Sequence, residues 1–350
     1  MARIVVLGGS GFLGSRVVTG LRKAGADVTV ASRRSEVKVD ATKPETFVAL
    51  EPYDVVVDLS DTVTNAPDAV IAWCLERGKC VIEATSEARC VERLHAAHLG
   101  TKGRLVLGGG IFTGVSNLLA RDVAQRVGTL ESVTLGVASS PFSGSGRGTI
   151  ALMVKALEVP ATRYEGGQRI EEPKVRRGPP LDFGGVTRPS GYMSLAEPFM
   201  VQHSTGAPKV DVLFAPKPGL LVPAFAAIPG WLARSRWFQA FMRGYFTVLR
   251  RLLLRGVGSA VELVATASGS GARVTRWVKA TDGMDAGGFA LAAMAEAVAA
   301  KADWSGARFI DDVTALEPIV ARTNELAGTP LLELSAPLTG EARPTKTLAA

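Results

Sequence analysis

The stretch Gly8-Gly9-Ser10-Gly11-Phe12-Leu13-Gly14 follows an apolar run from Arg3 to Leu7 and opens a helical pattern that continues to about Arg22. Its glycines fit both the GxxGxxG and the GxGxxG spacing. Glycine lets the backbone turn sharply and touch a pyrophosphate, and the N-terminus of the following helix favours the phosphate charge. Because strand, glycines and helix occur in the required order, the sequence predicts that residues 8–14 bind a dinucleotide.

The end of the second predicted strand, Asp27 to Ala31, indicates which dinucleotide is preferred. NAD-binding proteins usually have an acid there, which holds the ribose 2′-hydroxyl. This chain has Ser32-Arg33-Arg34 instead, and two guanidinium groups with a hydroxyl suit a 2′-phosphate that a carboxylate would repel. We therefore expect NADP as the cofactor, with a solvated basic turn as the alternative.

Strand and helix patterns alternate through the first third of the chain. Strands are expected at 37–39, 54–59, 80–84 and 104–107, and helices at 67–77 and 87–98. This alternation predicts a doubly wound parallel sheet of the Rossmann type. The ends of its strands add further residues to the predicted cofactor site, namely Asp40 at the adenine edge, Ser60, Thr85 and Gly110.

The composition is that of a globular protein, with 350 residues, 47% hydrophobic residues and a formal charge of +7. We expect this charge to be spread along the chain apart from local clusters, which favours anionic ligands or surfaces over nucleic acid. The three cysteines form no CxxC motif, and a strand begins at Arg3 with no apolar run approaching a membrane span. These features predict a cytoplasmic protein.

A second informative stretch, Gly-Gly-Gly-Ile-Phe-Thr-Gly-Val-Ser-Asn-Leu-Leu, occupies residues 108–119. Its part from Gly110 to Leu118 resembles the Gly-x-x-Pro-Gly-hydrophobic-x-x-hydrophobic pattern of the saccharopine dehydrogenase family. The segment 81–87 is similar to the strand-acid-serine-glutamate segment of the same family. Thr113 stands where the family usually has proline, and Glu83 stands where an aspartate is common.

The resemblance covers most of residues 3–302 and implies an NADP(H)-dependent oxidoreductase that transfers hydride to or from a C=N or C=C bond. It also implies a second, α+β substrate domain, and a C-terminal helix that packs back across the domain junction. We accordingly expect a Rossmann domain at 1–128, a substrate domain at 129–283, returning helices at 284–330 and a tail at 331–350. The tail from about Glu341 is expected to be disordered.

Arg147 and His203 are the candidates for substrate chemistry in the second domain. Arg147 lies in a Ser/Gly-rich loop before a predicted helix, where a guanidinium suits an anionic group such as a carboxylate. The loop is similar to one that enters the catalytic domain beside the nicotinamide in the family. A plain helix cap is the alternative for Arg147, and a structural role is the alternative for His203.

Some kinds of site are excluded or disfavoured. His95 and His98 lie three residues apart on a predicted helix without a third ligand, so we expect a solvated pair and no metal site. No tyrosine is followed by lysine four residues later, which excludes short-chain reductase chemistry. All three cysteines precede the second domain, which makes a thioester mechanism improbable. Hydride transfer needs no covalent protein group, so an enzyme is still expected.

A basic amphipathic helix is expected within 231–255, with arginines 236, 243 and 250 spaced seven apart. Its apolar residues are expected to form one stripe, consisting of Phe238, Phe241, Met242, Tyr245, Val248, Leu249 and Leu252. Such a helix could cover the substrate cavity, form a homodimer interface or lie on an anionic membrane surface. The partners expected are thus a small, anionic substrate and, through this helix, a second copy or a membrane, but no nucleic acid. The alternative function is a catalytically inactive NADP-binding regulatory or membrane-surface protein.

Overall fold

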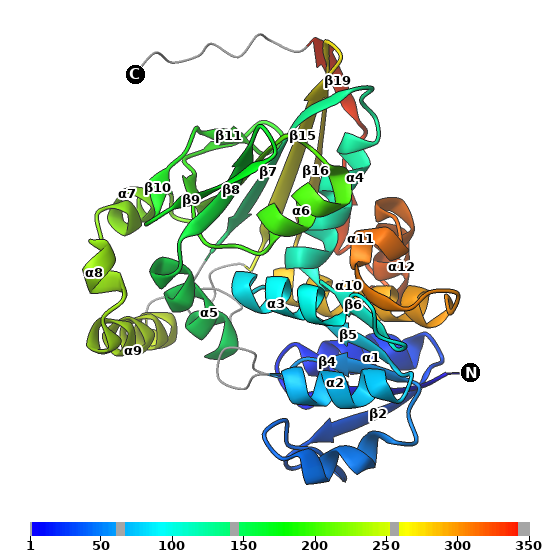
Figure 1. Cartoon of the computed structure of the whole chain (residues 1–350). Helices are drawn as coiled ribbons and strands as arrows, with labels where there is room; N and C mark the ends of the chain where they lie inside the picture. Colours follow the sequence, from blue (N-terminus) through cyan, green and yellow to red (C-terminus); the bar gives the residue numbers. More distant parts are fainter. Residues whose placement is uncertain (1, 61–66, 141–146, 253–258, 342–350) are drawn as a thin grey trace.

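The structure, a computed structural model, describes residues 2–60, 67–140, 147–252 and 259–341, apart from the side chains of 147–149, 249–252 and 341. Two β-sheets are stacked, with the N-terminal sheet below the larger second sheet in the view of Figure 1. A row of helices borders the second sheet on one side. Within the described residues, no helix is both long and apolar enough to cross a membrane.

The N-terminal sheet has seven parallel strands with β1 near its centre. In spatial order they are β17 (Gly306–Phe309), β6 (Arg104–Leu107), β5 (Cys80–Glu83), β4 (Val55–Asp58), β1 (Arg3–Leu7), β2 (Asp27–Ser32) and β3 (Val37–Lys38). Strands that run outward from β1 on both sides define a doubly wound Rossmann sheet. Together with the mixed second sheet, this topology confirms the predicted fold class.

Helices cover both faces of the N-terminal sheet, and each face has its own apolar core. The core on one face contains Val6 and Val57, and its helices are α1 (Gly14–Lys23), α4 (Ser116–Ala124) and α10 (Gly283–Ala299). The other core contains Val5 and Val56, and its helices are η1 (Pro44–Leu50), α2 (Asp68–Glu76) and α3 (Ala88–His98). Successive strand residues alternate between the two cores, which explains why these strands are apolar throughout.

The second sheet is mixed, because β14 pairs in parallel with β7 while β15 and β16 form an antiparallel hairpin. Its strands are β7 (Leu130–Ser139), β8 (Ala161–Glu165), β9 (Gln168–Glu172), β10 (Arg176–Arg177), β13 (Gly191–Tyr192), β14 (Lys209–Pro216), β15 (Val261–Gly269), β16 (Ala272–Ala280), β18 (Leu332–Leu334) and β19 (Leu338–Glu341). Its helices are α5 (Arg147–Glu158), α6 (Glu197–Thr205), α7 (Leu221–Ala226), α8 (Gly230–Ala233) and α9 (Arg236–Leu252).

Two segments differ from the sequence-based expectation. The run 173–189, whose Pro/Gly/Arg-rich composition predicts a long loop, instead contains β10 and the small hairpin of β11 (Leu181–Asp182) and β12 (Thr187–Arg188). Residues 332–341, expected to belong to the tail, form β18 and β19, which both pair with β16. These pairings cover what would otherwise be an exposed edge of the sheet. The expected disorder after Glu341 falls outside the described residues.

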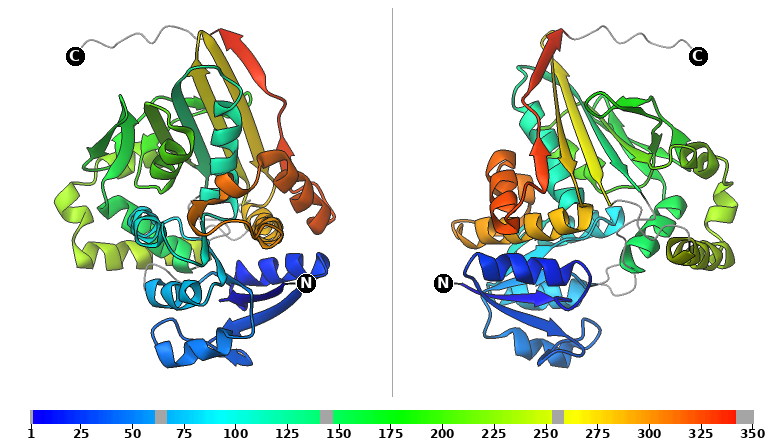
Figure 2. Two further views of the ribbon diagram at one scale, coloured as in Figure 1. Left: turned by 45° about the vertical axis from the view of Figure 1, so that its right-hand side comes forward. Right: turned by 180° about the vertical axis from the view of Figure 1, so that it is seen from behind.

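Helix α10 returns the chain from the second sheet to the first. It packs along α1 at very short range, because a Cβ on Gly288 would lie 2.3 Å from Cβ of Arg16, and one on Gly20 would lie 2.6 Å from Cβ of Ala292. The right-hand view of Figure 2 shows α10 directly above α1. After α10, the chain adds β17 to the edge of the N-terminal sheet, followed by α11 (Ile310–Val313) and α12 (Leu316–Ala327).

Arg276 on β16 connects the second sheet to helices α4 and α12. Its guanidinium is buried and donates from Nη1 to Asp122 Oδ2 of α4 and to Glu317 Oε1 of α12, each over 2.6 Å. Burial acts to raise the pKa of Asp122, but hydrogen bonds from Arg126 and Arg276 outweigh it and hold that pKa below its usual range. A buried cation bonded to two carboxylates fixes how these elements meet.

We expect Gly288→Ala to lower the free energy of unfolding by about 1 to 3 kcal/mol, because the added methyl group overpacks the contact between α1 and α10. Gly244→Ala is the matched control, since a Cβ there meets nothing within 4 Å on α9. Alanine in an open helical position should instead add about 0.5 to 1 kcal/mol. Urea unfolding of both variants measures the difference, and equal effects of the two substitutions would contradict the close contact.

Candidate functional site

A cavity of about 460 Å³ lies at the carboxyl ends of the strands of the N-terminal sheet, where ligands bind in folds of this kind. Both sheets contribute to its walls. The residues come from the first glycine turn, the ends of β4, β5 and β7, the turn after β6, helix α5, the segment 193–197 and the start of α10. The structure thus brings together the two glycine-rich stretches that are about a hundred residues apart in the sequence.

The first glycine turn requires residues without a side chain at particular positions. Gly8 has a φ of 76°, in the left-handed region that allows the strand to turn sharply. A Cβ on Gly14 would lie 2.2 Å from the carbonyl oxygen of Gly8, so only glycine lets α1 begin so close to β1. Gly11 donates its N–H to the same oxygen over 2.8 Å. The turn therefore presents bare backbone to the cavity, as a pyrophosphate site requires.

The predicted cofactor-binding residues divide into two groups. Those that line the cavity are Gly8, Gly11, Phe12, Leu13, Gly14, Ser60, Thr85 and Gly110. Gly9 is buried under the turn against Val18, and Ser10 is exposed. Asp40 accepts hydrogen bonds from the N–H and hydroxyl groups of Thr42, which lower its pKa, and it does not line the cavity. Contact of each residue with a cofactor stays a prediction.

The basic turn after β2 lies beside the first glycine turn, since the Gly8 N–H donates to a β2 carbonyl over 2.9 Å. The hydroxyl oxygen of Ser32 accepts hydrogen bonds from the N–H groups of Arg34, over 3.1 Å, and Ser35, over 3.0 Å. The side chains of Arg33 and Arg34 are exposed and form no ion pair with any described residue. Both guanidinium groups are thus available to an anion at the end of β2.

The second glycine turn contains a strained residue, Thr113, inside the π-helical turn Ile111–Val115. Thr113 has a φ of 56° and donates its N–H to Glu197 Oε1 over 3.0 Å. Proline has a φ near −65° and no N–H, so it could adopt neither this conformation nor this bond. The departure from the saccharopine dehydrogenase pattern at this position therefore has a structural reason.

Glu197, the first residue of α6, is a site residue that the sequence analysis missed. It lines the cavity and is fully buried, with Oε1 accepting hydrogen bonds from Thr113 N and from Ser116 Oγ, the latter over 3.2 Å. Its Oε2 has no hydrogen-bond partner among the described residues. Burial raises the pKa of Glu197, which favours the protonated carboxyl group. A Glu-Pro pair at a helix start was its only sequence signal, and that signal does not reveal burial.

Asp58 and Glu83 form a second group of buried acids, at paired positions on β4 and β5. Asp58 Oδ1 accepts from the N–H of Ser60 over 2.8 Å, and Glu83 Oε1 accepts from the N–H of Thr85 over 3.0 Å. Burial and the neighbouring charge of Asp58 raise the pKa of Glu83 well above its usual range. The pair fixes the two loops that carry Ser60 and Thr85 into the cavity.

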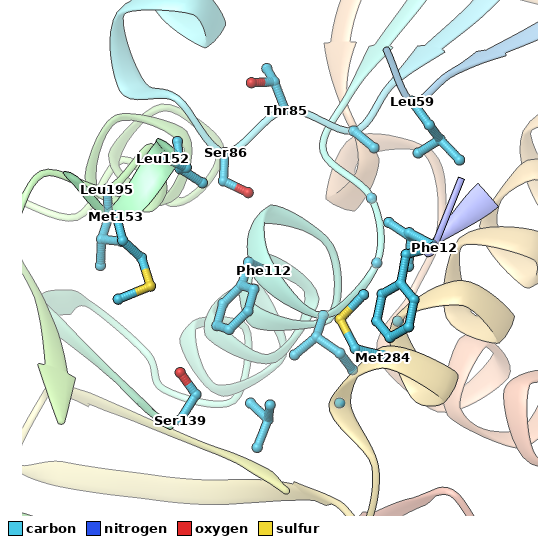
Figure 3. Close-up of a pocket in the computed structure, with 18 of the residues that line it drawn as sticks. Phe12, Leu59, Thr85, Ser86, Phe112, Ser139, Leu152, Met153, Leu195 and Met284 are labelled. Atoms are coloured by element: carbon cyan, nitrogen blue, oxygen red, sulfur yellow. The ribbon is translucent and has the colours of Figure 1, made fainter. Parts of the chain in front are cut away.

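Apolar side chains make up most of the rest of the cavity wall. Figure 3 shows them in two groups, with Phe112 between them: on one side Phe12, Leu59 and Met284, and on the other Leu152, Met153 and Leu195. The first group adjoins the glycine turn, and the second comes from α5 and the segment before α6. The cavity therefore has two ends. One lies beside the first glycine turn, and the other, called the apolar end, is formed by Leu152, Met153 and Leu195.

The two predicted catalytic residues are not placed in this cavity by the described atoms. Arg147 begins α5, but its side chain and the loop 141–146 lie outside the described residues, so the anion site stays a prediction. The ring of His203 packs against His95, with 4.6 Å between ring centroids, and against Phe309, and His203 does not line the cavity. Its catalytic role also stays a prediction, without support from this geometry.

His95 and His98 are buried and not solvated, so that expectation was wrong. The His95 ring stacks on Phe309 with an interplanar angle of 14°, because α3 packs beside β17, an element that the sequence pattern did not reveal. Burial lowers the pKa of both histidines. Within the described residues, no group of three or more His, Cys, Asp or Glu side chains is arranged to hold a metal ion.

Comparison with known proteins supports a nicotinamide dinucleotide as the cofactor. The sequence profile of the NAD dependent epimerase/dehydratase family matches residues 4–99, which include the first glycine turn and the basic turn. No curated protein matches the chain. The matches do not single out the saccharopine dehydrogenase family, and that resemblance stays a prediction.

Solved structures similar to the chain include the WlbA (WbpB) dehydrogenase from Thermus thermophilus in complex with NAD and UDP-GlcNAcA, at 13% identity and a TM-score of 0.40, covering 93% of this chain and 95% of that one. An oxidoreductase from Sinorhizobium meliloti has the same identity and coverage and a TM-score of 0.41. The UDP-glucose 4-epimerase from Thermus thermophilus, in complex with NAD, has 15% identity and a TM-score of 0.27, covering 72% of this chain and 100% of that one.

We expect Gly11→Val to abolish dinucleotide binding while the protein stays folded, because the branched side chain would occupy the space of the pyrophosphate. Among the atoms of the described residues, a Cβ at this position approaches one, the Gly8 carbonyl oxygen at 3.0 Å. Cofactor titration and circular dichroism measure the two effects separately. A folded variant with unchanged affinity would remove the glycine turn from the binding site.

Proposed function

We propose that the protein is an NADP(H)-dependent oxidoreductase that reduces, or in reverse forms, a C=N or C=C bond of a small substrate. The observation that carries this proposal is the shared cavity, in which the first glycine turn meets an apolar chamber with a buried acid, Glu197, whose pKa is raised by burial. A bound nicotinamide would supply the hydride. The protein would hold the cofactor, exclude water and provide the proton that completes a reduction.

The cofactor would be held at the end of the cavity formed by the first glycine turn. Backbone N–H groups of the turn and of the start of α1 suit the pyrophosphate, and Ser60 and Thr85 reach the same space from β4 and β5. Arg33 and Arg34 lie beside this turn, and no carboxylate of the described residues is bonded to them, which supports a preference for the 2′-phosphate of NADP.

Glu197 is the residue that we assign to proton transfer. Two hydrogen bonds fix Oε1, which leaves Oε2 as the oxygen that can carry and deliver the proton. In the reducing direction, Oε2–H would donate its proton to the nitrogen or carbon of the substrate that does not receive the hydride. The carboxylate left behind would remain stabilised by Thr113 and Ser116.

The substrate would occupy the apolar end of the cavity, against α5 and the segment before α6. Leu152, Met153 and Leu195 there suit an apolar portion of the substrate. An anionic group on the substrate would bind Arg147 at the N-terminus of α5, where the helix also favours negative charge. This part of the proposal rests on the sequence of the loop and on the position of α5.

The proposal is tested by incubating the purified protein with NADPH and identifying retained small molecules by mass spectrometry after removal of free ligand. Candidate imines and activated alkenes of matching chemistry are then assayed for NADPH oxidation. An oxidoreductase should turn over at least one of them, with the hydride of deuterated NADPH recovered in the product. NADPH binding with no turnover of any retained compound would instead support the inactive regulatory alternative.

We expect NADPH to bind at least about tenfold more tightly than NADH, a difference of about 1.4 kcal/mol. Replacing Arg33 and Arg34 together by alanine should abolish this preference without weakening NADH binding. The matched control replaces Arg22 and Lys102, two exposed cations near the amino ends of the strands of the same sheet, and should leave the preference intact. Fluorescence titration measures all four affinities, and a double variant that still prefers NADPH would contradict the assignment.

We expect Glu197→Gln to slow reduction at least about a hundredfold while NADPH affinity changes little. Since the donor must be protonated, the parent should lose activity as pH rises through the raised pKa of Glu197, and the variant should lack this decline. The infrared band of the buried protonated carboxyl should also diminish in the variant. Asp211→Asn, at a buried acid bonded to Tyr192 outside the cavity, is the control and should change none of these readouts.

A further inference from the structure

The excess positive charge of the chain lies in one segment, residues 212–261, which includes the basic helix expected within 231–255. The chain has 40 basic and 33 acidic residues, and this segment contains seven basic residues and no acidic one, which leaves 33 of each elsewhere. The segment includes α7, α8 and α9. Its cations are Lys217, Arg234, Arg236, Arg243, Arg250, Arg251 and Arg255.

Helix α9 has two apolar faces, whereas one stripe was expected. One face contains Phe238, Met242 and Phe246, of which the last two are buried in the core that also includes α5. The other face is solvent-exposed, with 66% of Trp237 and 57% of Phe241 accessible. These residues follow at helical spacing, which continues along the helix to Tyr245 and Val248. The exposed face is therefore a continuous apolar strip.

The exposed arc of α9 also carries charge. At 3.6 residues per turn, the aromatic edge at Trp237 is followed around the helix by the small residues Ala240 and Gly244, and then by the exposed Arg236 and Arg243. Neither of these arginines forms an ion pair with a described residue. The exposed arc therefore has aromatic side chains along one edge, small residues in its middle and arginines along the other edge.

The neighbouring elements extend this surface. Of the eleven large apolar side chains that are exposed in the described part of the chain, six lie between residues 220 and 248. They include Trp231 on α8, which is 73% exposed, and Leu220 just before α7, which is 68% exposed. Figure 1 shows α7, α8 and α9 at the outer edge of the molecule, beyond α5.

We propose that α8 and α9 dock the protein on an anionic lipid bilayer. Tryptophan and tyrosine favour the boundary between water and acyl chains, and arginines at the edge of such a helix bind anionic headgroups. The small residues Ala240 and Gly244 let the helix axis approach the surface. Helix α5 packs against the buried face of α9, and its Leu152, Met153 and Ala156 line the cavity, so α5 lies between the docked helix and the site.

The positive charge of residues 212–261 favours a bilayer over a second copy of the chain as the partner of this face. A two-fold contact would place this segment against itself. Each copy would then bring the exposed Arg236 and Arg243 of α9, and no carboxylate from residues 212–261, to the contact region, so that like charges would oppose association. An anionic lipid surface neutralises the same cations. The chemistry of the face therefore matches lipid better than it matches a homodimer.

The test is co-sedimentation of the full chain with vesicles of phosphatidylglycerol and, separately, of phosphatidylcholine. The protein should bind the anionic vesicles at low salt with a blue shift of tryptophan fluorescence, release them as salt increases, and bind the neutral vesicles at least about tenfold more weakly. Equal binding to both lipids, or no binding to either, would overturn the proposal.

Paired variants locate the surface. Trp237→Glu with Phe241→Glu should reduce binding to anionic vesicles at least about tenfold, whereas Val48→Glu with Leu99→Glu, which alters two apolar residues exposed by 68% and 58% elsewhere, should not. NADPH affinity should be unchanged in both pairs, so the outcome is independent of the proposed oxidoreductase function. A parent that is dimeric by light scattering, and that the first pair converts to monomer without any vesicle binding, would show that a second copy occupies the face.

Discussion

The close contact between α1 and α10 is the constraint on which the rest of the structure depends. Glycines at positions 20 and 288 let the two helix backbones approach to a distance that no side chain would allow. Helix α10 is the segment that comes back from the second sheet, and its first turn contributes Gly283, Met284 and Gly287 to the cavity wall. The same contact therefore joins the two sheets and closes the site between them.

Buried acids give the site its chemical character. Asp58 and Glu83 stabilise the loops at the ends of β4 and β5, and their pKa behaviour follows from burial and mutual proximity. Glu197 also lines the cavity, and its Oε2, like Asp58 Oδ2 and Glu83 Oε2, has no hydrogen-bond partner in the described residues. Leaving a buried polar atom unpaired costs free energy, and a protein retains such an atom most readily where a ligand will bond to it.

The sequence predicted the local features of this molecule better than the long-range ones. The turn at residues 8–14 and the Rossmann alternation follow from glycine spacing and strand periodicity, which are local properties, and the fold class is confirmed. Glu197 and the burial of His95 could not be foreseen, because α6 and β17 approach them from distant parts of the chain. The sequence showed Thr113 only as a replacement of the usual proline. The positive φ of Thr113 and its hydrogen bond to Glu197 explain why proline is absent at this position.

The confinement of the net charge to residues 212–261 has an electrical consequence for the whole molecule. A protein whose positive and negative charges balance over most of its sequence, and which is cationic at one edge, has a large dipole moment. The electric field of a charged surface therefore rotates it before contact. It should therefore approach any polyanionic surface, including a cation-exchange resin, in a single orientation. Held in this way, the molecule would turn the outer edge formed by α7, α8 and α9 toward the surface.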